Sequence, residues 1–278
     1  MMRFTMVLLV LGLLVTLRFD DHPAHANEPE FRSENFVVNT YRGGPAAENV
    51  ATLCESLRVE LTRVWCNKTI ATWNPPCEIR IHATLASYVH SVGPGGAQTL
   101  GSSLIQVNAG RTLSRRIDLL VDPTGELPAL PHELTHVVLS DRFDGQQPPH
   151  WLDEGAAMMA DTDHKRSLHE RDCREALRQG SAMPLSVLFS LEQFTSAEQM
   201  AAFYGQSASL TKFLCTKGGI QDVTRFGVDA MRVGYQQALK DNYKIASVME
   251  LEHQWKQSIY NGDPELRNPV ELSVSFRP

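Results

Sequence analysis

Two histidines, His132 and His136, stand four positions apart, and Glu133 directly follows the first of them. Apolar residues recur at helical spacing from 127 to 139, so this segment is expected to be a helix. Four residues turn a helix by about 400°, which brings both imidazoles to one face, roughly 6 Å apart. Two imidazoles placed in this way can bind one zinc ion. Glu133 would lie beside that face, where its carboxylate can take a proton from a water molecule that the ion activates.

A catalytic zinc ion needs a third protein ligand and keeps one open position for water. A turn-rich segment, residues 141 to 149, separates the histidines from a second predicted helix that starts at Trp151. Glu154 on that helix can face the first helix and complete a set of two histidines and one glutamate. We therefore expect one zinc ion to be bound by His132, His136 and Glu154.

The residues around both predicted helices resemble the gluzincin, or peptidase MA-like, zinc metallopeptidases, in which HExxH is followed by a helix with the pattern W-L-x-E-G-x-A. Residues 131 to 157 fit this pattern closely, and Y-G-Q-S-A at 204 to 208 is similar to the Y-x-Q-S segment of the same family. The resemblance is specific over about 30 residues and diffuse elsewhere. It implies hydrolysis of peptide bonds, the ligand roles named above, and the role of general base for Glu133.

The family resemblance also implies a hydrogen-bond donor for the oxyanion, commonly a tyrosine or histidine from the helical half. Tyr204 is the candidate, and the alternative is a tyrosine packed in the core or at an interface. His150 could also donate, although a histidine on a surface loop is the simpler interpretation. Thermolysin-like enzymes place an aspartate four residues after the glutamate ligand, where this chain has Met158. The carboxylate partner of a zinc histidine is therefore left open between Asp153 and Asp161.

The elements that must position these residues follow an α+β order. An N-terminal arm or short edge strand over residues 27 to 45 precedes a metallopeptidase domain over 46 to 278. The domain has an α/β part with a small mixed sheet up to about residue 150, and a mainly helical part over 151 to 262. The patterns predict strands at 77–82, 103–108 and 116–121, and helices at 45–65, 85–89, 127–139, 151–160, 165–178, 184–190, 197–216, 220–233 and 245–260.

Residues 1 to 26 have the organisation of a signal peptide. Arg3 precedes an apolar run from 7 to 17, and a polar stretch then ends in Ala24, His25 and Ala26. The apolar run has about half of the roughly 20 residues that a membrane-spanning helix needs, which argues against an uncleaved anchor. We expect cleavage after Ala26, a secreted, periplasmic or cell-envelope location, and no stable membrane insertion afterwards.

Export affects how the five cysteines are interpreted, because oxidising compartments favour disulfides. None of them has C-x-x-C spacing, so a cysteine zinc site is not expected. Cys54 and Cys66 fall on one predicted helix and are about 18 Å apart along its axis, too far for a disulfide. The expected pairs are Cys66 with Cys77 and Cys173 with Cys215, which leaves one thiol over.

The composition places the chain among ordinary globular proteins. Of its 278 residues, 42% are hydrophobic and 21% are charged, so disorder is not expected. The net charge is -6 and basic residues are scattered, which gives no indication of binding to nucleic acid or to an anionic membrane. The expected partner is a peptide or protein substrate, and the sequence leaves the oligomeric state open.

Two alternatives to a peptidase remain. One is a zinc-containing binding or assembly module of the cell envelope that cleaves nothing, and the other is a zinc amidase that acts on a cell-wall amide. The zinc site does not distinguish amide substrates, because the same water and base serve any amide. Glu133 favours catalysis, since a purely structural zinc site has no use for a carboxylate beside its ligands.

Overall fold

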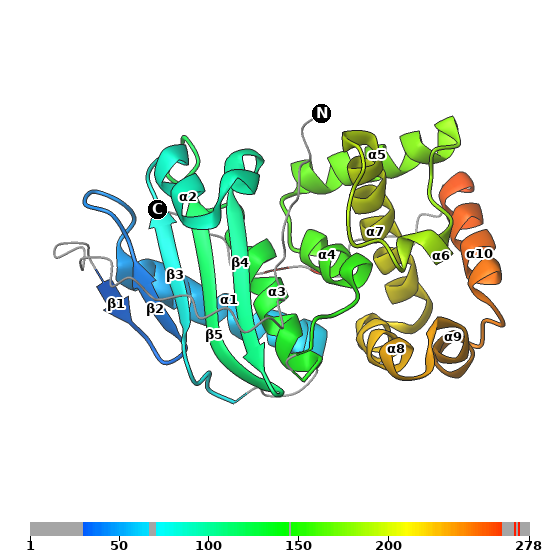
Figure 1. Cartoon of the computed structure of the whole chain (residues 1–278), viewed down its shortest axis with the longest axis horizontal. Coiled ribbons are helices and arrows are strands. Elements are labelled where there is room, and N and C mark those ends of the chain that lie inside the picture. The colour runs from blue at the N-terminus through cyan, green and yellow to red at the C-terminus, as the bar shows by residue number, and fades with distance from the viewer. Residues whose placement is uncertain (1–29, 67–70, 145, 263–269, 271, 273–278) are drawn as a thin grey trace.

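Figure 1 presents the computed structural model of the chain, which describes residues 30–66, 71–144, 146–262, 270 and 272. The predicted signal peptide, residues 1 to 26, lies outside the described residues. Among the helices that are described, none has an apolar stretch long enough to cross a membrane.

The N-terminal half contains a mixed sheet of five strands in the order β1-β2-β3-β5-β4. Strand β3 pairs in parallel with β2 and β5, whereas β1 and β4 are the antiparallel outer strands. The strands are β1 (Glu30–Arg32), β2 (Phe36–Asn39), β3 (Cys77–His82), β4 (Gly101–Asn108) and β5 (Arg111–Leu120). The segment from 27 to 45 thus contributes the edge strand β1 and also an inner strand, β2.

Helices α1 (Ala47–Cys66) and α3 (Leu130–Arg142) pack against each other and against the sheet (Figure 1). Helix α1 buries an apolar stripe that includes Val50, Leu57 and Leu61, as its helical periodicity predicts. Helix α2 (Leu85–Val92) and the 3-10 helix η1 (Pro94–Gln98) connect β3 to β4. The outer strand β4 lies next to α3.

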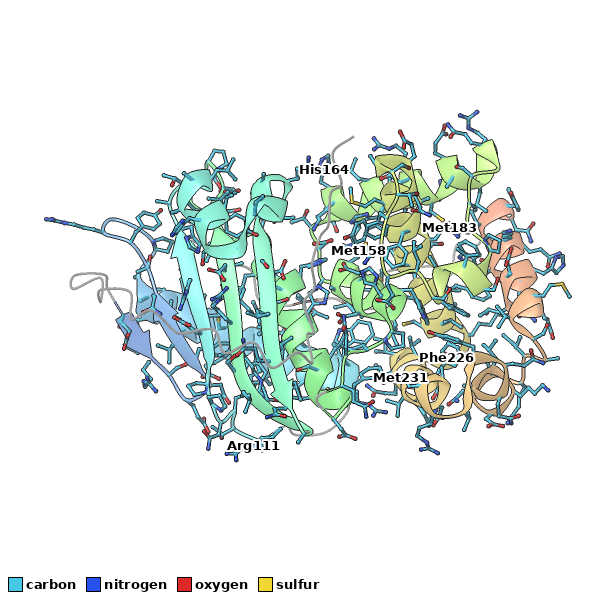
Figure 2. The ribbon with its side chains drawn as sticks, viewed as in Figure 1. Arg111, Met158, His164, Met183, Phe226 and Met231 are labelled. Atoms are coloured by element: carbon cyan, nitrogen blue, oxygen red, sulfur yellow. The ribbon has the colours of Figure 1, made fainter. Side chains whose placement is uncertain are left out.

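The C-terminal half is mainly helical, and the long α7 contacts α4, α5 and α8 (Figure 1). Figure 2 labels Met158, Met183 and Phe226, which are buried within this half. The helices are α4 (His150–Met159), α5 (Asp163–Gln179), α6 (Leu185–Leu188), α7 (Ala197–Gly218), α8 (Ile220–Val233), α9 (Tyr235–Tyr243) and α10 (Val248–Tyr260).

Helix α4 approaches α7 closely at Gly155. A Cβ atom at this position would lie 2.6 Å from the backbone oxygen of Ser207 and would also clash with Thr211. Only glycine permits this separation between the two helices. The close packing determines where α4, and therefore Glu154, lies relative to the rest of the helical half.

The expected α+β order is confirmed, and most differences are at element ends. Strand β5 begins at Arg111 instead of 116, because its first residues form a polar, exposed hairpin with β4 that lacks alternating apolar residues. Helix α9 was not predicted. It buries only Ala238 and Leu239 among its nine residues, which is too few to give a helical apolar pattern.

All five cysteines are free and buried, so the predicted disulfides are wrong. The sulfur of Cys66 lies 3.9 Å from the backbone oxygen of Val138 in α3. Burial, and secondly the proximity of Cys77, raises the pKa of the Cys54 thiol well above its usual value. Cys77 is therefore near Cys54. Because Cys54 and Cys66 are about 18 Å apart along α1, Cys77 cannot form a disulfide with Cys66.

The members of the second predicted pair lie at different points along α7. Cys173 of α5 packs against Gly205, where a Cβ atom would lie 2.6 Å from the Cys173 backbone nitrogen. Cys215 lies ten residues further along the same helix as Gly205, which is about 15 Å. Burial raises the pKa of the Cys173 thiol to about 11 and that of Cys215 to about 12, as expected of unreactive core thiols.

Candidate metal centre

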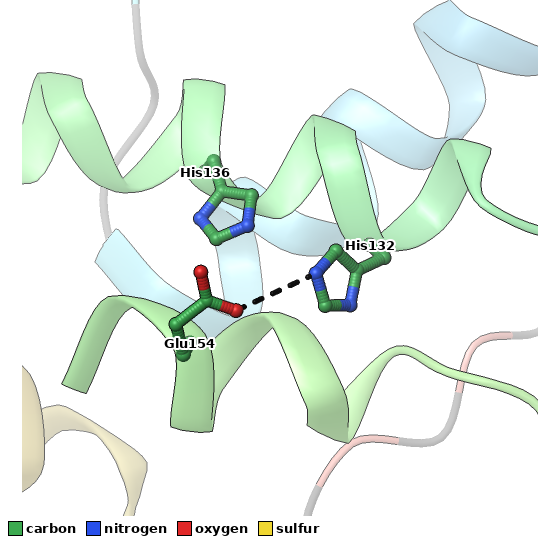
Figure 3. A group of neighbouring side chains, drawn as sticks. All are labelled: His132, His136 and Glu154. Carbon is green, nitrogen blue, oxygen red and sulfur yellow. Dashed lines mark ion pairs between the residues drawn. The ribbon is translucent and has the colours of Figure 1, made fainter. Parts of the chain in front are cut away.

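Helix α3 carries His132 and His136 on one buried face, as their spacing predicts. Their ring centroids are 5.0 Å apart, with an angle of 75° between the ring planes. Pro131 lies in the first turn of the helix, where its missing N–H group costs no hydrogen bond. Both imidazoles point away from α3 toward α4, which lies on the other side of them (Figure 3).

Glu154 of α4 is the third member of the group. Its Oε2 atom lies 3.9 Å from Nε2 of His132, and one ligand atom from each of the three side chains lies within 4.8 Å of the others (Figure 3). Two ligands of a tetrahedral zinc ion are about 3.4 Å apart, so small side-chain movements would bring these atoms into coordination. His132, His136 and Glu154 thus form a buried group that can hold a metal ion.

Each histidine has its own carboxylate partner at Nδ1. Nδ1 of His136 lies 3.0 Å from Oδ1 of Asp153, and Nδ1 of His132 lies 3.2 Å from Oδ1 of Asp161. A carboxylate at Nδ1 holds the ring in place and leaves Nε2 for a metal ion. The sequence left the partner open between the two aspartates, and in the structure both of them take the role.

Several carboxylates surround the two imidazoles. Burial alone would lower the pKa of His136, but Asp153, followed by Glu154 and Glu133, raises it to about 10. Burial alone would raise the pKa of Asp161, but His132 and Lys165 hold it well below its usual range. Four carboxylates therefore lie around two imidazoles, namely Glu133, Asp153, Glu154 and Asp161. Two imidazoles and one carboxylate are a donor set that can hold a divalent cation such as zinc.

Glu133 lies on α3 where this helix meets the outer strand β4. A Cβ atom on Gly101 of β4 would lie 2.6 Å from Cγ of Glu133 and 2.8 Å from Cβ of Ala129. The glycine therefore leaves the space that the Glu133 side chain occupies. The carboxylate is buried, yet it is close enough to the histidines to contribute to the raised pKa of His136.

Tyr204 of α7 lies close to the same carboxylates. Burial, followed by Glu154 and then Glu133, raises the pKa of its hydroxyl far above the usual value. Its ring packs against Phe194 and Phe203, with centroids 5.7 Å away in both cases. The two interpretations made from the sequence are therefore compatible, because Tyr204 packs among aromatic side chains and also lies near the candidate ligands.

His150 is the first residue of α4, and its interpretation as a surface-loop histidine is wrong. Its Nδ1 atom lies 3.0 Å from the backbone oxygen of Leu191, which can only accept a hydrogen bond, so Nδ1 donates. Its Nε2 atom lies 3.9 Å from Oε1 of Glu154. The ring is 4.6 Å from that of Phe203. His150 is thus held in a fixed orientation next to a candidate metal ligand.

Sequence reasoning missed the residues that surround Asp161. Nζ of Lys165 lies 2.9 Å from Oδ1 of Asp161, and Nε2 of His169 lies 3.6 Å from Oδ2. Lys165 and His169 are four residues apart, which places both side chains on one face of α5. This spacing could have indicated from the sequence that both face the same partner. Both basic groups stabilise the ionised form of Asp161.

No protein-family model and no curated protein matches the chain. Any assignment of a function therefore depends on the residues and the geometry described above.

Proposed function

We propose that this protein is a zinc-dependent metallopeptidase of the gluzincin type that acts outside the cytoplasm. His132, His136 and Glu154 bind one zinc ion, and Glu133 is the general base. The observation that carries the proposal is the convergence of two imidazoles and a carboxylate from separate helices, with a further carboxylate beside them. The resemblance of residues 131 to 157 to the gluzincin pattern supports the same conclusion.

A zinc ion in this group would activate a water molecule and polarise the carbonyl of a bound peptide. Glu133 takes the proton of the attacking water as the new C–O bond forms. It then gives this proton to the amine nitrogen as the C–N bond breaks. Tyr204 donates a hydrogen bond to the oxyanion, and its position near Glu154 and Glu133 supports this role.

Strand β4 supplies a surface for an extended substrate. Among the described strands it pairs only with β5, so its other edge has backbone N–H and C=O groups without a strand partner. A peptide added along this edge would pass Gly101, whose backbone lies next to the Glu133 side chain. This arrangement would bring a peptide bond to the general base.

The test is to measure zinc content and peptide hydrolysis in the purified protein and in Glu133→Gln. We expect about one zinc ion per chain in both, and hydrolysis lower by about 10² to 10⁴-fold in the variant, the usual contribution of a general base. Glu48→Gln is the control, because Glu48 is an exposed glutamate on α1. Unchanged hydrolysis in Glu133→Gln would remove this residue from the mechanism.

The same preparation tests the two alternatives. Zinc-loaded protein that releases products from cell-wall material but cleaves no peptide would be an amidase. A diverse peptide library and cell-wall material are both supplied in excess. Zinc-loaded protein that cleaves neither of them would be a binding or assembly module.

A further inference from the structure

His150 connects the candidate metal centre to a neighbouring cavity. It is one of the residues that line a cavity of about 270 Å³ at the start of α4. Its Nε2 atom is also 3.9 Å from Oε1 of Glu154. A ligand in this cavity would therefore be separated from the metal ligand Glu154 by a single side chain. The volume is slightly below the usual range for drug-sized ligands, so it suits one side chain of a larger ligand.

The walls of the cavity are mostly apolar and aromatic. Phe189 and Tyr235 stack with their centroids 4.1 Å apart and only 15° between the ring planes. The indole N–H of Trp151 donates a hydrogen bond of 3.0 Å to the Tyr235 hydroxyl, which fixes that ring. Pro149 and Met231 add further apolar surface, and Met231 of α8, labelled in Figure 2, is 44% exposed. The cavity is thus preformed and open to solvent.

Glu192 gives the cavity its charge. Among the described residues that line it, Glu192 is the only acidic one, and none is a lysine or an arginine. Burial raises the pKa of Tyr235, the hydrogen bond from Trp151 lowers it, and the charge of Glu192 raises it, with a net rise to about 12. The effect of Glu192 indicates that its carboxylate is near the Tyr235 hydroxyl. A cation in the cavity would meet a carboxylate and aromatic faces, both of which attract positive charge. An anion would be repelled by Glu192.

We propose that this cavity is a subsite for the side chain of a lysine or arginine in the substrate, close to the bond that is cleaved. The aliphatic stem would lie against Met231 and Pro149, and the charged end would reach Glu192 and the stacked rings. Arginine and lysine are the residues that combine a long apolar stem with a positive end. The inference rests on the proposed peptidase function, because it assigns the cavity to the substrate of that site.

Binding is measured first, without cleavage, using the zinc-loaded Glu133→Gln protein. Three peptides that differ at a single position, with arginine, norleucine or glutamate, are titrated by calorimetry. We expect the arginine peptide to bind about tenfold more tightly than the norleucine peptide, and the glutamate peptide to bind least well. Glu192→Gln, added to the same protein, should remove the advantage of arginine, and Glu192→Lys should reverse the order of the charged peptides. Equal binding of the three peptides would overturn the inference.

Two further variants separate charge from shape. Glu48→Lys makes the same change in net charge on α1, outside the cavity lining, and should leave the order of the peptides unchanged. Ala230→Trp, at a buried position of the lining, should fill the cavity and weaken binding of the arginine peptide. Glu192 is exposed, so its variants are expected to fold even where Ala230→Trp does not.

Hydrolysis by the protein with Glu133 intact then distinguishes the two proposals. Cleavage that is indifferent to basic residues, or a preference that survives Glu192→Lys, would contradict the subsite and leave the peptidase function intact. Absence of cleavage of every peptide, together with selective binding of the arginine peptide, would contradict the peptidase function while supporting a cation-selective cavity.

Discussion

Asp153 and Glu154 are neighbours in the chain, yet Asp153 contacts Nδ1 of His136 at 3.0 Å while Oε2 of Glu154 lies 3.9 Å from Nε2 of His132. One turn of α4 therefore both contacts a histidine of α3 and carries a candidate ligand. Any displacement of α4 along α3 would disturb both contacts at once. The relative position of these two helices is the main geometric requirement of the candidate metal centre.

Replacing Asp153 by asparagine should weaken zinc binding by about 10 to 100-fold, because the orientation and basicity of His136 depend on this carboxylate. The dissociation constant is measured by competition with a chromophoric chelator. Asp163→Asn is the control, since the side chain of Asp163 is 94% exposed on α5. An unchanged constant in Asp153→Asn would contradict the role of this contact.

Zinc binding should displace protons from the metal-free protein. Because the pKa of His136 is about 10 in the folded chain, the ring is protonated at pH 7 and must lose its proton to coordinate an ion. We expect release of about one proton per ion at pH 7 and weaker binding as the pH falls. Calorimetry in buffers of different ionisation enthalpy measures the number of protons released per zinc ion. Release of no protons would contradict the assignment of His136 as a zinc ligand.

The raised pKa of His136 should also make the stability of the metal-free protein depend on pH. The usual histidine pKa is 6.5, whereas the pKa of His136 in the folded chain is about 10. The contribution of protonated His136 to the free energy of unfolding is therefore complete below about pH 6.5 and is lost as the pH rises through about 10. Urea denaturation of the chelator-treated protein should give a lower free energy of unfolding at pH 9.5 than at pH 6.5. Asp153→Asn should reduce this difference, and an identical difference in the variant would argue against the pair.

Replacing Gly101 by alanine should impair hydrolysis while zinc remains bound. The new Cβ atom would lie 2.6 Å from Cγ of Glu133, so the carboxylate must move. A displacement of about 1 Å can cost as much as about 10²-fold in rate. Ser102→Ala in the same strand is the control. The prediction fails if Gly101→Ala retains the full rate, or if it loses its zinc.

Removal of the metal ion should lower thermal stability. Zinc at 100 times its dissociation constant adds about 2.7 kcal/mol to the free energy of unfolding, provided that the unfolded chain does not bind it. Calorimetric scans with zinc and with a chelator should therefore give different Tm values. In Glu154→Gln the difference should shrink, because one ligand loses its charge. Equal Tm values for the original protein under both conditions would contradict a resident ion.

The sequence by itself determined the local features of the site. The spacing of His132 and His136 places both rings on one helix face whatever the rest of the chain does, because the pitch of an α-helix is constant. Glu133 is beside them for the same reason. The alternation from Cys77 to His82 likewise predicts a strand with the bounds that are observed, since each of its inward side chains is buried.

Only the tertiary structure decided the contacts between elements. It assigned Asp153 to His136 and Asp161 to His132, brought His150 next to Glu154, and kept Cys173 apart from Cys215. These contacts depend on how helices cross and how closely they approach, as at Gly155, where the backbone of α7 occupies the space of a side chain. The repeat of a helix or strand is set by its own backbone geometry, whereas the offset between two packed elements is set by the shapes of all the side chains between them.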